Sequence, residues 1–355
     1  MMSNSVKSFR VGINPISKSD VFTRGDFLLG QVTLELSDNC KIDSLCVKLK
    51  GKAEVRWTEN YGKTIVTYHN KEKYFSIKQS VFQEGRGSTV GPGCHDYPFT
   101  FQIPAQELPS SFKGSHGKIV YTVEAILSRP MKLDSKAKAQ FTLMQKRNPH
   151  SDAFLMTPQH STIDKKMKLF TSGTVGMDVN ITQTGFVQGE GIKVVASIQN
   201  KSSRDIRPKY CLYRKYSYFA KSKRRVETKD ILKEVGEAIP PSAGQTVTRI
   251  ITIPATMCAS ILNCSIIKAE YRLRVYLDVK YASDPEIKFP IVILPAPQGP
   301  DDERQPPPYG FDGFADLSIG TNFLQNPTAL DPSAPPPSYG TYAMYPSLTG
   351  ADGKY

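Results

Sequence analysis

The chain has 355 residues, of which 39% are hydrophobic and 22% are charged, and its formal net charge is +13. This length is enough for two domains of about 150 residues, each with its own core. No apolar run approaches the ~18 residues that a membrane-spanning helix needs, which argues against an integral membrane protein.

Segments in which hydrophobic and polar residues alternate dominate the first 296 residues. This period of two is typical of antiparallel strands with one buried face. The alternating runs cover 31–36, 45–50, 53–58, 121–125, 194–198 and, most clearly, 271–280. No long stretch repeats every 3.6 residues. The sequence therefore predicts an all-β protein built from immunoglobulin-like β-sandwiches. A glycine-rich stretch at 83–98 predicts a long loop, which is a candidate binding edge.

Three short landmarks occur twice in the same order, which predicts an internal repeat. They are a Phe-x-x-Gly-acid motif, an Ile-Pro pair and a tyrosine two positions before an aliphatic residue. The first set lies at 22–26, 103–104 and 121–123, and the second lies at 186–190, 253–254 and 271–273. We predict two copies of one sandwich, at 8–145 and 167–296, with a connector at 146–166.

The last 59 residues, 297–355, differ from the rest in composition. They hold 11 prolines and seven glycines but few aliphatic residues, so we expect this tail to be disordered. Seven acidic and two basic residues give the tail a charge of −5, which leaves +18 for the rest of the chain. A basic body favours anionic partners such as lipid headgroups or phosphorylated peptides.

Two Pro-Pro-x-Tyr motifs lie in this tail, at 306–309 and 336–339. Proline fixes φ and favours the extended polyproline II helix, whose ordering cost is low. Aromatic grooves of WW domains bind that shape, and the tyrosine fills a second slot. We interpret the motif residues as WW-binding positions: Pro306, Pro307, Tyr309, Pro336, Pro337 and Tyr339. The alternative is a spacer whose prolines only keep the tail extended.

Several stretches resemble a known family. Residues 9–11, 22–34 and 50–57 look like the N-terminal arrestin domain, and residues 208–215, 236–240 and 261–264 look like the C-terminal arrestin domain. With the two tail motifs, the chain resembles the arrestin domain-containing proteins, or alpha-arrestins, over nearly its whole length.

The resemblance implies an adaptor. Members of this family bind membrane receptors or transporters as cargo through the arrestin domains and recruit HECT-type ubiquitin ligases, which carry WW domains, through the tail. Ubiquitin is then placed on the cargo or on the adaptor, and the cargo undergoes endocytosis and endosomal sorting. The resemblance also implies a cytoplasmic protein that is recruited to the plasma membrane and endosomes.

Two other classes of function stay open. One is a membrane-trafficking coat or scaffold of arrestin fold that works without a ubiquitin ligase. The other is a redox-linked metabolic regulator of the thioredoxin-interacting type, which needs a reactive cysteine. The strand expected at 245–251 has no cysteine where that relative has its redox cysteine, although Cys258 follows later. The six cysteines form no Cys-x-x-Cys pair, and we expect them to be reduced in an intracellular protein.

Catalytic and metal-binding motifs are not apparent. The five histidines lie outside any His-Glu-x-x-His pattern, and the chain has no Gly-x-Ser-x-Gly. Cys94 and His95 are adjacent, but two ligands do not make a zinc site. We therefore expect no enzyme activity, no cofactor and no metal. Because no recognition helix or RNA-binding strand motif accompanies the basic charge, we expect no nucleic-acid partner.

A basic cluster follows an aromatic-rich run at 213–219. It consists of Lys221, Lys223, Arg224 and Arg225. These side chains are candidates for contact with anionic lipid or with a phosphorylated cargo tail. The alternative is a charged hairpin tip that keeps a sheet edge soluble.

Overall fold

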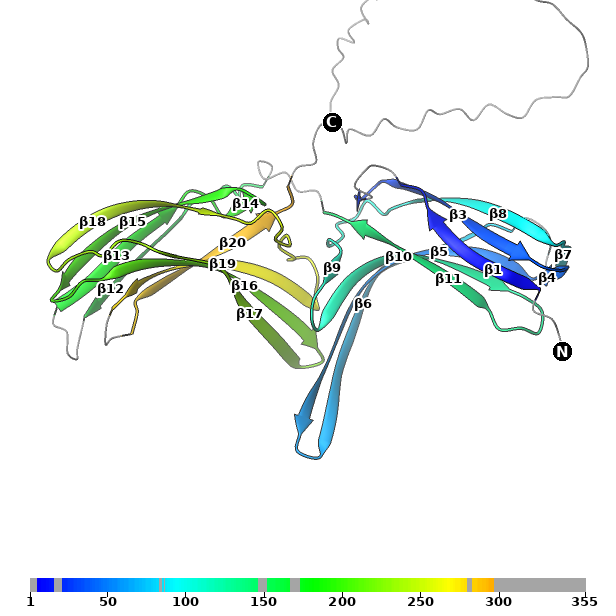
Figure 1. Ribbon diagram of the computed structural model, residues 1–355, viewed down its shortest axis with the longest axis horizontal. Coiled ribbons are helices and arrows are strands. Elements are labelled where there is room, and N and C mark those ends of the chain that lie inside the picture. Colours follow the sequence, from blue (N-terminus) through cyan, green and yellow to red (C-terminus); the bar gives the residue numbers. More distant parts are fainter. Residues whose placement is uncertain are drawn as a thin grey trace, which may run out of the picture. The chain divides into compact units, whose positions relative to one another are not determined.

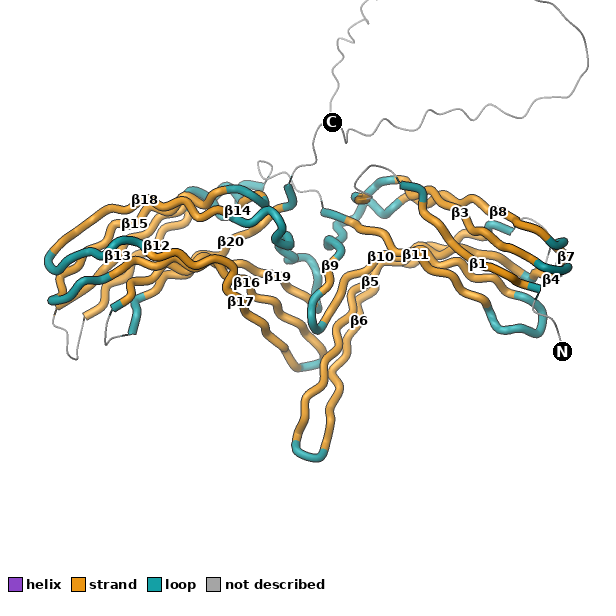
Figure 2. The backbone as a smooth tube through the Cα atoms, viewed as in Figure 1, coloured by secondary structure: helices purple, strands orange, loops and turns teal. Residues whose placement is uncertain are grey.

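The computed structural model describes residues 5–15, 21–82, 85, 87–145, 152–166, 173–279 and 283–296. All regular secondary structure in these ranges is β-strand (Figures 1 and 2). The strands form two sandwiches in tandem, β1 to β11 and β12 to β20. This confirms the predicted all-β class and the pair of sandwiches. The predicted tail, 297–355, lies outside the described residues.

The first sandwich pairs a three-stranded sheet with a larger one. The smaller sheet has the order β1 (Val6–Ile13), β3 (Phe27–Leu36) and β8 (Gly93–Gln102). The larger has the order β2 (Val21–Phe22), β11 (Ser135–Leu143), β10 (Gly117–Ser128), β5 (Ser44–Tyr61) and β6 (Thr64–Ser80), with β9 (Phe112–Lys113) added beside β10. A small ladder joins β4 (Cys40–Ile42) to β7 (Ser88–Val90).

The second sandwich repeats this plan. One sheet has the order β12 (Gln159–Lys166), β13 (Gly173–Ile181), β15 (Gly191–Ser202) and β18 (Ala243–Thr252). The other has the order β14 (Gly185–Val187), β20 (Glu286–Leu294), β19 (Ile267–Asp278), β16 (Arg207–Ala220) and β17 (Lys223–Val235). In each sandwich a short strand pairs in parallel at one edge, β2 with β11 and β14 with β20.

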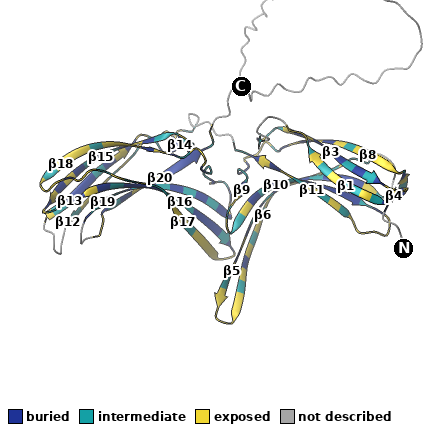
Figure 3. Cartoon of the chain, viewed as in Figure 1, coloured by how far each residue is buried: buried dark blue, intermediate teal, exposed yellow. Residues whose placement is uncertain are grey.

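The cores follow from the alternation in the sequence. Along β19, buried and half-buried residues alternate over all 12 positions, as the period of two predicts (Figure 3). Buried aliphatic and aromatic residues from both sheets fill each sandwich. The first core also includes residues of the second half of the chain, among them Tyr216, Tyr218, Cys264 and Ile267. The two sandwiches therefore share part of one hydrophobic core.

The repeated landmarks occupy equivalent places. The Asp26 carboxylate accepts a hydrogen bond from the Thr23 N–H at 2.5 Å, and the Glu190 carboxylate accepts one from the Val187 N–H at 2.7 Å. The glycine before each acid has a positive φ, 82° at Gly25 and 87° at Gly189. This left-handed turn suits glycine, because a Cβ would be strained there. The internal repeat is thus confirmed, and both copies have the same hydrogen-bonded turn with a glycine of positive φ.

Two boundary expectations differ from the structure. The expected loop at 83–98 holds β7 and the start of β8, whose Pro98 is tolerated because β8 is an edge strand. The expected connector at 146–166 ends in β12, which pairs with β13 and belongs to the second sandwich. Its single aliphatic residue among polar ones, Ile163, gives almost no hydrophobic alternation to detect.

Candidate functional site

The predicted WW-binding residues, Pro306 to Tyr309 and Pro336 to Tyr339, lie outside the described residues. Of the site residues expected from sequence, the structure places only the basic cluster, Lys221, Lys223, Arg224 and Arg225. The remaining features of the candidate site come from contacts between the two sandwiches, which no sequence motif predicts.

The basic cluster occupies the turn between β16 and β17. Lys221 has a φ of 54° in the two-residue turn, and all four cations are exposed. Arg224 folds back on its own sheet, where it donates a hydrogen bond to Ser217 Oγ at 2.8 Å. Its guanidinium carbon lies 5.4 Å from the centre of the Phe219 ring.

This turn lies next to the long β5–β6 hairpin of the first sandwich. The pKa of Glu59 in β5 lies below its usual range because Tyr61 and Trp57 donate hydrogen bonds to its carboxylate. The positive charges of Lys223 and Arg225 add to that effect. Asn70 Nδ2 of β6 also donates a hydrogen bond to the Phe219 carbonyl of β16 at 3.5 Å, so two hairpins far apart in sequence are neighbours in the fold.

Two carboxylates, Glu72 and Glu227, join the sandwiches close to these hairpins. Glu72 of β6 accepts hydrogen bonds from the N–H and the hydroxyl of Ser265. Glu227 of β17 accepts a hydrogen bond from Ser115 Oγ at 2.6 Å and lies 3.0 Å from His116 Nε2. Each carboxylate is thus held by the neighbouring sandwich.

A cleft of about 510 Å³ opens between the two sandwiches. Its wall includes three cations and one carboxylate, Lys113, Arg214, Lys229 and Asp230. Arg214 lies over the Tyr216 ring at 4.5 Å from the centroid. Asp230 is paired with Lys233 at 2.7 Å, which lowers the pKa of its carboxyl. The free charges in the cleft are therefore positive, and an anionic group is the ligand that they favour.

Cys258 also lines this cleft, and its chemistry bears on the redox alternative. The thiol is partly buried, and burial raises its pKa, while the positive charge of Arg214 opposes that effect. Cys264 is buried, and burial raises its pKa too. The thiolate is the nucleophilic form, so raised pKa values disfavour thiol exchange at both positions.

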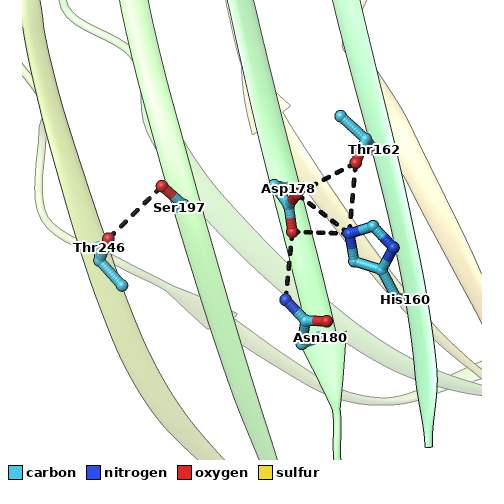
Figure 4. Close-up of polar contacts among 6 residues, drawn as sticks. All are labelled: His160, Thr162, Asp178, Asn180, Ser197 and Thr246. Atoms are coloured by element: carbon cyan, nitrogen blue, oxygen red, sulfur yellow. Dashed lines mark hydrogen bonds and ion pairs between the residues drawn. The ribbon is translucent and has the colours of Figure 1, made fainter.

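A polar network covers the outer face of β12, β13, β15 and β18 (Figure 4). His160 Nε2 lies 3.0 Å from both carboxylate oxygens of Asp178, and Thr162 Oγ1 lies 3.4 Å from the same nitrogen. A catalytic triad needs the acid on one ring nitrogen and the nucleophile on the other. Ser197 instead contacts Thr246 at 3.4 Å. The network therefore stabilises a sheet surface and does not have the geometry of a hydrolase site.

Metal ligands do not gather in the described ranges, where no group of three or more His, Cys, Asp or Glu side chains is close enough to hold an ion. His95 Nε2 lies 2.9 Å from the Gly91 carbonyl, and the adjacent Cys94 is exposed. Over the same ranges, no helix has the length and hydropathy to cross a membrane.

Comparisons with known proteins agree with this architecture. The family model described as arrestin (or S-antigen), N-terminal domain, matches residues 9–148, and the corresponding C-terminal domain model matches residues 171–298. The first match covers the first sandwich from within β1 onwards, and the second covers β13 to β20 of the second sandwich but not β12.

Similar proteins include arrestin domain-containing protein 4 from Mus musculus, which is 30% identical over 302 residues, 81% of this chain and 72% of the relative. The Homo sapiens protein of the same name is 29% identical over 335 residues, 89% of this chain and 77% of the relative. The thioredoxin-interacting protein of Rattus norvegicus is 27% identical over 298 residues, 82% of this chain and 75% of the relative.

Proposed function

The chain belongs to the alpha-arrestin family, and we propose that it is an adaptor that binds membrane receptors or transporters and recruits HECT-type ubiquitin ligases to them. Proteins of this family are adaptors and not enzymes. The adaptor brings a ligase and its cargo together, so that the cargo is ubiquitinated, endocytosed and sorted into endosomes. It acts from the cytoplasm, at the plasma membrane and on endosomes.

The order of the parts carries this proposal. Two arrestin domain matches, at 9–148 and 171–298, are followed by Pro-Pro-x-Tyr motifs at 306–309 and 336–339. The folded part supplies the surface for cargo, and the tail supplies the docking peptides. Neither part needs a cofactor for this task.

The physics of the tail supports docking to WW domains. The prolines of each motif favour the polyproline II conformation before binding, which lowers the entropic cost of docking. Tyr309 and Tyr339 are 30 positions apart, and a flexible linker of that length spans about 30 Å. Two WW domains of one ligase therefore fit within the reach of a single tail.

The two other classes have weaker support. A coat or scaffold of arrestin fold would not need Tyr309 or Tyr339. A redox regulator would need a reactive thiol, yet β18 contains no cysteine and burial raises the pKa of Cys258. We therefore favour the adaptor over both.

Ubiquitin transfer to the adaptor itself tests the proposal. The full chain is incubated with ubiquitin, its activating and conjugating enzymes, and a HECT ligase that carries tandem WW domains. We expect modification of the wild type and almost none of the double variant Tyr309→Ala/Tyr339→Ala. Tyr342→Ala is the matched control, since this tail tyrosine has no Pro-Pro prefix. Equal modification of all three proteins would refute ligase recruitment through the motifs.

A further inference from the structure

The β5–β6 hairpin is unusually long and its end is exposed. The strands run from Ser44 to Tyr61 and from Thr64 to Ser80, and the outer part of the hairpin projects beyond the other strands of its sheet (Figures 1 and 3). Gly62 in the turn has a φ of 63°, which suits glycine. Because its end has no strand of its own sheet to cover it, the side chains there are free to meet a partner.

Apolar side chains lie on both faces of this end. Ile65 is 70% exposed and Tyr61 is 52% exposed. Tyr61 pairs with Thr64 and Ile65 pairs with Asn60, so the two apolar residues project from opposite faces of the ladder. A hairpin end with apolar groups on both faces is suited to insertion into an apolar layer and less suited to a flat protein contact.

Positive charges flank the apolar end. Lys63 lies in the turn, and the β16–β17 turn with Lys223 and Arg225 lies beside the hairpin, where Asn70 Nδ2 of β6 donates a hydrogen bond to the Phe219 carbonyl of β16 at 3.5 Å. Segments 59–65 and 221–227 together hold five basic and two acidic side chains. Both acids accept hydrogen bonds from the folded part, Glu59 from Tyr61 and Trp57, and Glu227 from Ser115, with His116 Nε2 3.0 Å away. Five cations against two carboxylates give this surface a net positive charge.

We propose that this surface docks on membranes that contain anionic lipid. Tyr61 and Ile65 enter the boundary between headgroups and acyl chains, while Lys63, Lys223 and Arg225 contact lipid phosphates. Apolar groups at the end with cations behind them match the depth profile of a lipid leaflet, in which phosphates lie above the acyl chains. An acidic protein would match the cations but would leave the apolar end exposed.

The lipid contact goes beyond the adaptor function and is independent of it, because it uses neither the tail motifs nor cargo. Docking through the hairpin would hold the folded part on a membrane before a membrane protein is bound. A failure of lipid binding would leave the recruitment of ubiquitin ligases untouched, and the reverse also holds.

Co-sedimentation of the full chain with vesicles tests the proposal. The vesicles contain phosphatidylcholine alone, or phosphatidylcholine with about 30% phosphatidylserine. We expect binding only to the anionic vesicles, with an affinity that falls as salt is raised. Lys223→Gln/Arg225→Gln should weaken binding roughly 25-fold, since each basic residue near the surface contributes about fivefold. Ile65→Ser should weaken it about tenfold through lost apolar burial.

Matched variants elsewhere control for charge and hydrophobicity. Lys193→Gln/Lys201→Gln removes two exposed cations of β15, and Ile250→Ser removes an aliphatic residue of β18 that is 61% exposed. Both should bind vesicles like the wild type. The proposal is overturned if these controls lose as much binding as the hairpin variants, or if the wild type does not co-sediment with the anionic vesicles. Loss with the charge variant but not with Ile65→Ser would also overturn it, because it would show electrostatic adsorption to the lipid without insertion of the apolar end.

Discussion

Glu72 and Ser265 join the two sandwiches although they are 193 positions apart. The Glu72 carboxylate accepts hydrogen bonds from the Ser265 N–H at 2.9 Å and from its hydroxyl at 2.6 Å. One carboxylate oxygen of β6 therefore satisfies two donors that precede β19. This contact fixes the long hairpin of the first sandwich against the second.

Replacement of Glu72 by alanine should therefore destabilise the folded part. We expect Glu72→Ala to lower the free energy of unfolding by about 1 kcal/mol, because hydrogen bonds to a charged group are lost at a partly exposed site. Urea unfolding followed by tryptophan fluorescence measures the change, since Trp57 is the single tryptophan. Glu107→Ala is the control, because that carboxylate is more exposed and lies 3.8 Å from Arg24. An equal loss in both variants would contradict the role given to Glu72.

Gly30 in β3 is required by close packing. An added Cβ would overlap the Gly12 carbonyl oxygen and approach the Phe99 ring to 2.5 Å. We expect Gly30→Ala to cost about 2 kcal/mol, a typical penalty for overpacking. Gly12→Ala is a matched control on the neighbouring strand, where a Cβ meets nothing within 4 Å. The same urea midpoint for both variants would contradict this, because it would show that neighbouring groups move to accommodate a Cβ at Gly30.

Acid should weaken the first sandwich partly through Glu54. The Lys52 ammonium donates a hydrogen bond to its carboxylate at 2.8 Å, and the pKa of Glu54 is lowered to about 2 from an ordinary value of 4.5. Because the folded-state pKa is the lower one, this contribution is complete above pH 4.5 and disappears as the pH falls towards 2. At a partly exposed site we expect about 0.5 kcal/mol.

The measurement compares Glu54→Gln with the wild type at several pH values. The variant should be less stable at pH 7 and should approach the wild type as the pH falls below the ordinary carboxyl range. A constant difference between the two proteins at every pH would show that the ionised form of Glu54 does not matter.

Thiol labelling should separate the cysteines by exposure. Cys94 is exposed, whereas Cys258 is partly buried and Cys264 is buried, with burial raising the pKa of both latter thiols. We expect one fast-reacting thiol in the folded chain, which Cys94→Ser removes and Cys258→Ser does not. Labelling in denaturant should recover all six. Fast reaction at Cys258 would instead support a redox regulator, which needs a reactive cysteine.

The fold was largely predictable because its strands have one buried face. The alternation from Tyr271 onwards and the turn motifs at 22–26 and 186–190 depend on local chemistry, which the sequence contains directly. Edge strands were missed where the hydrophobic alternation is weak or interrupted. Strand β12 has a single aliphatic residue, Ile163, and β8 contains Pro98.

The candidate site was less predictable, because its parts meet only in three dimensions. The basic residues at 221–225 were visible as a charge run, but their position beside the β5–β6 hairpin depends on three-dimensional contacts such as that of Asn70 with Phe219. The contact of Glu72 with Ser265 has no short motif either. Sequence spacing gives no measure of such contacts between sandwiches.

Bivalent docking predicts a characteristic order among tail variants. Tyr309→Ala and Tyr339→Ala should each weaken binding to a tandem WW fragment by at least ~10²-fold, because one linked site is lost. Phosphorylation of either tyrosine should act in the same direction, since it places charge in an apolar slot. Titration calorimetry with the singly substituted chains measures these losses. If the double variant bound as well as each single variant, bivalency would be wrong.

The most direct test of the adaptor is the dissociation constant of the full chain for a tandem WW fragment of a HECT-type ligase. Wild type and Tyr309→Ala/Tyr339→Ala are compared, with Tyr342→Ala as the control for loss of a tail tyrosine. We predict tight binding by the wild type and the control, and no measurable binding by the double variant. Absence of binding by the wild type, or unchanged binding by the double variant, would contradict the account.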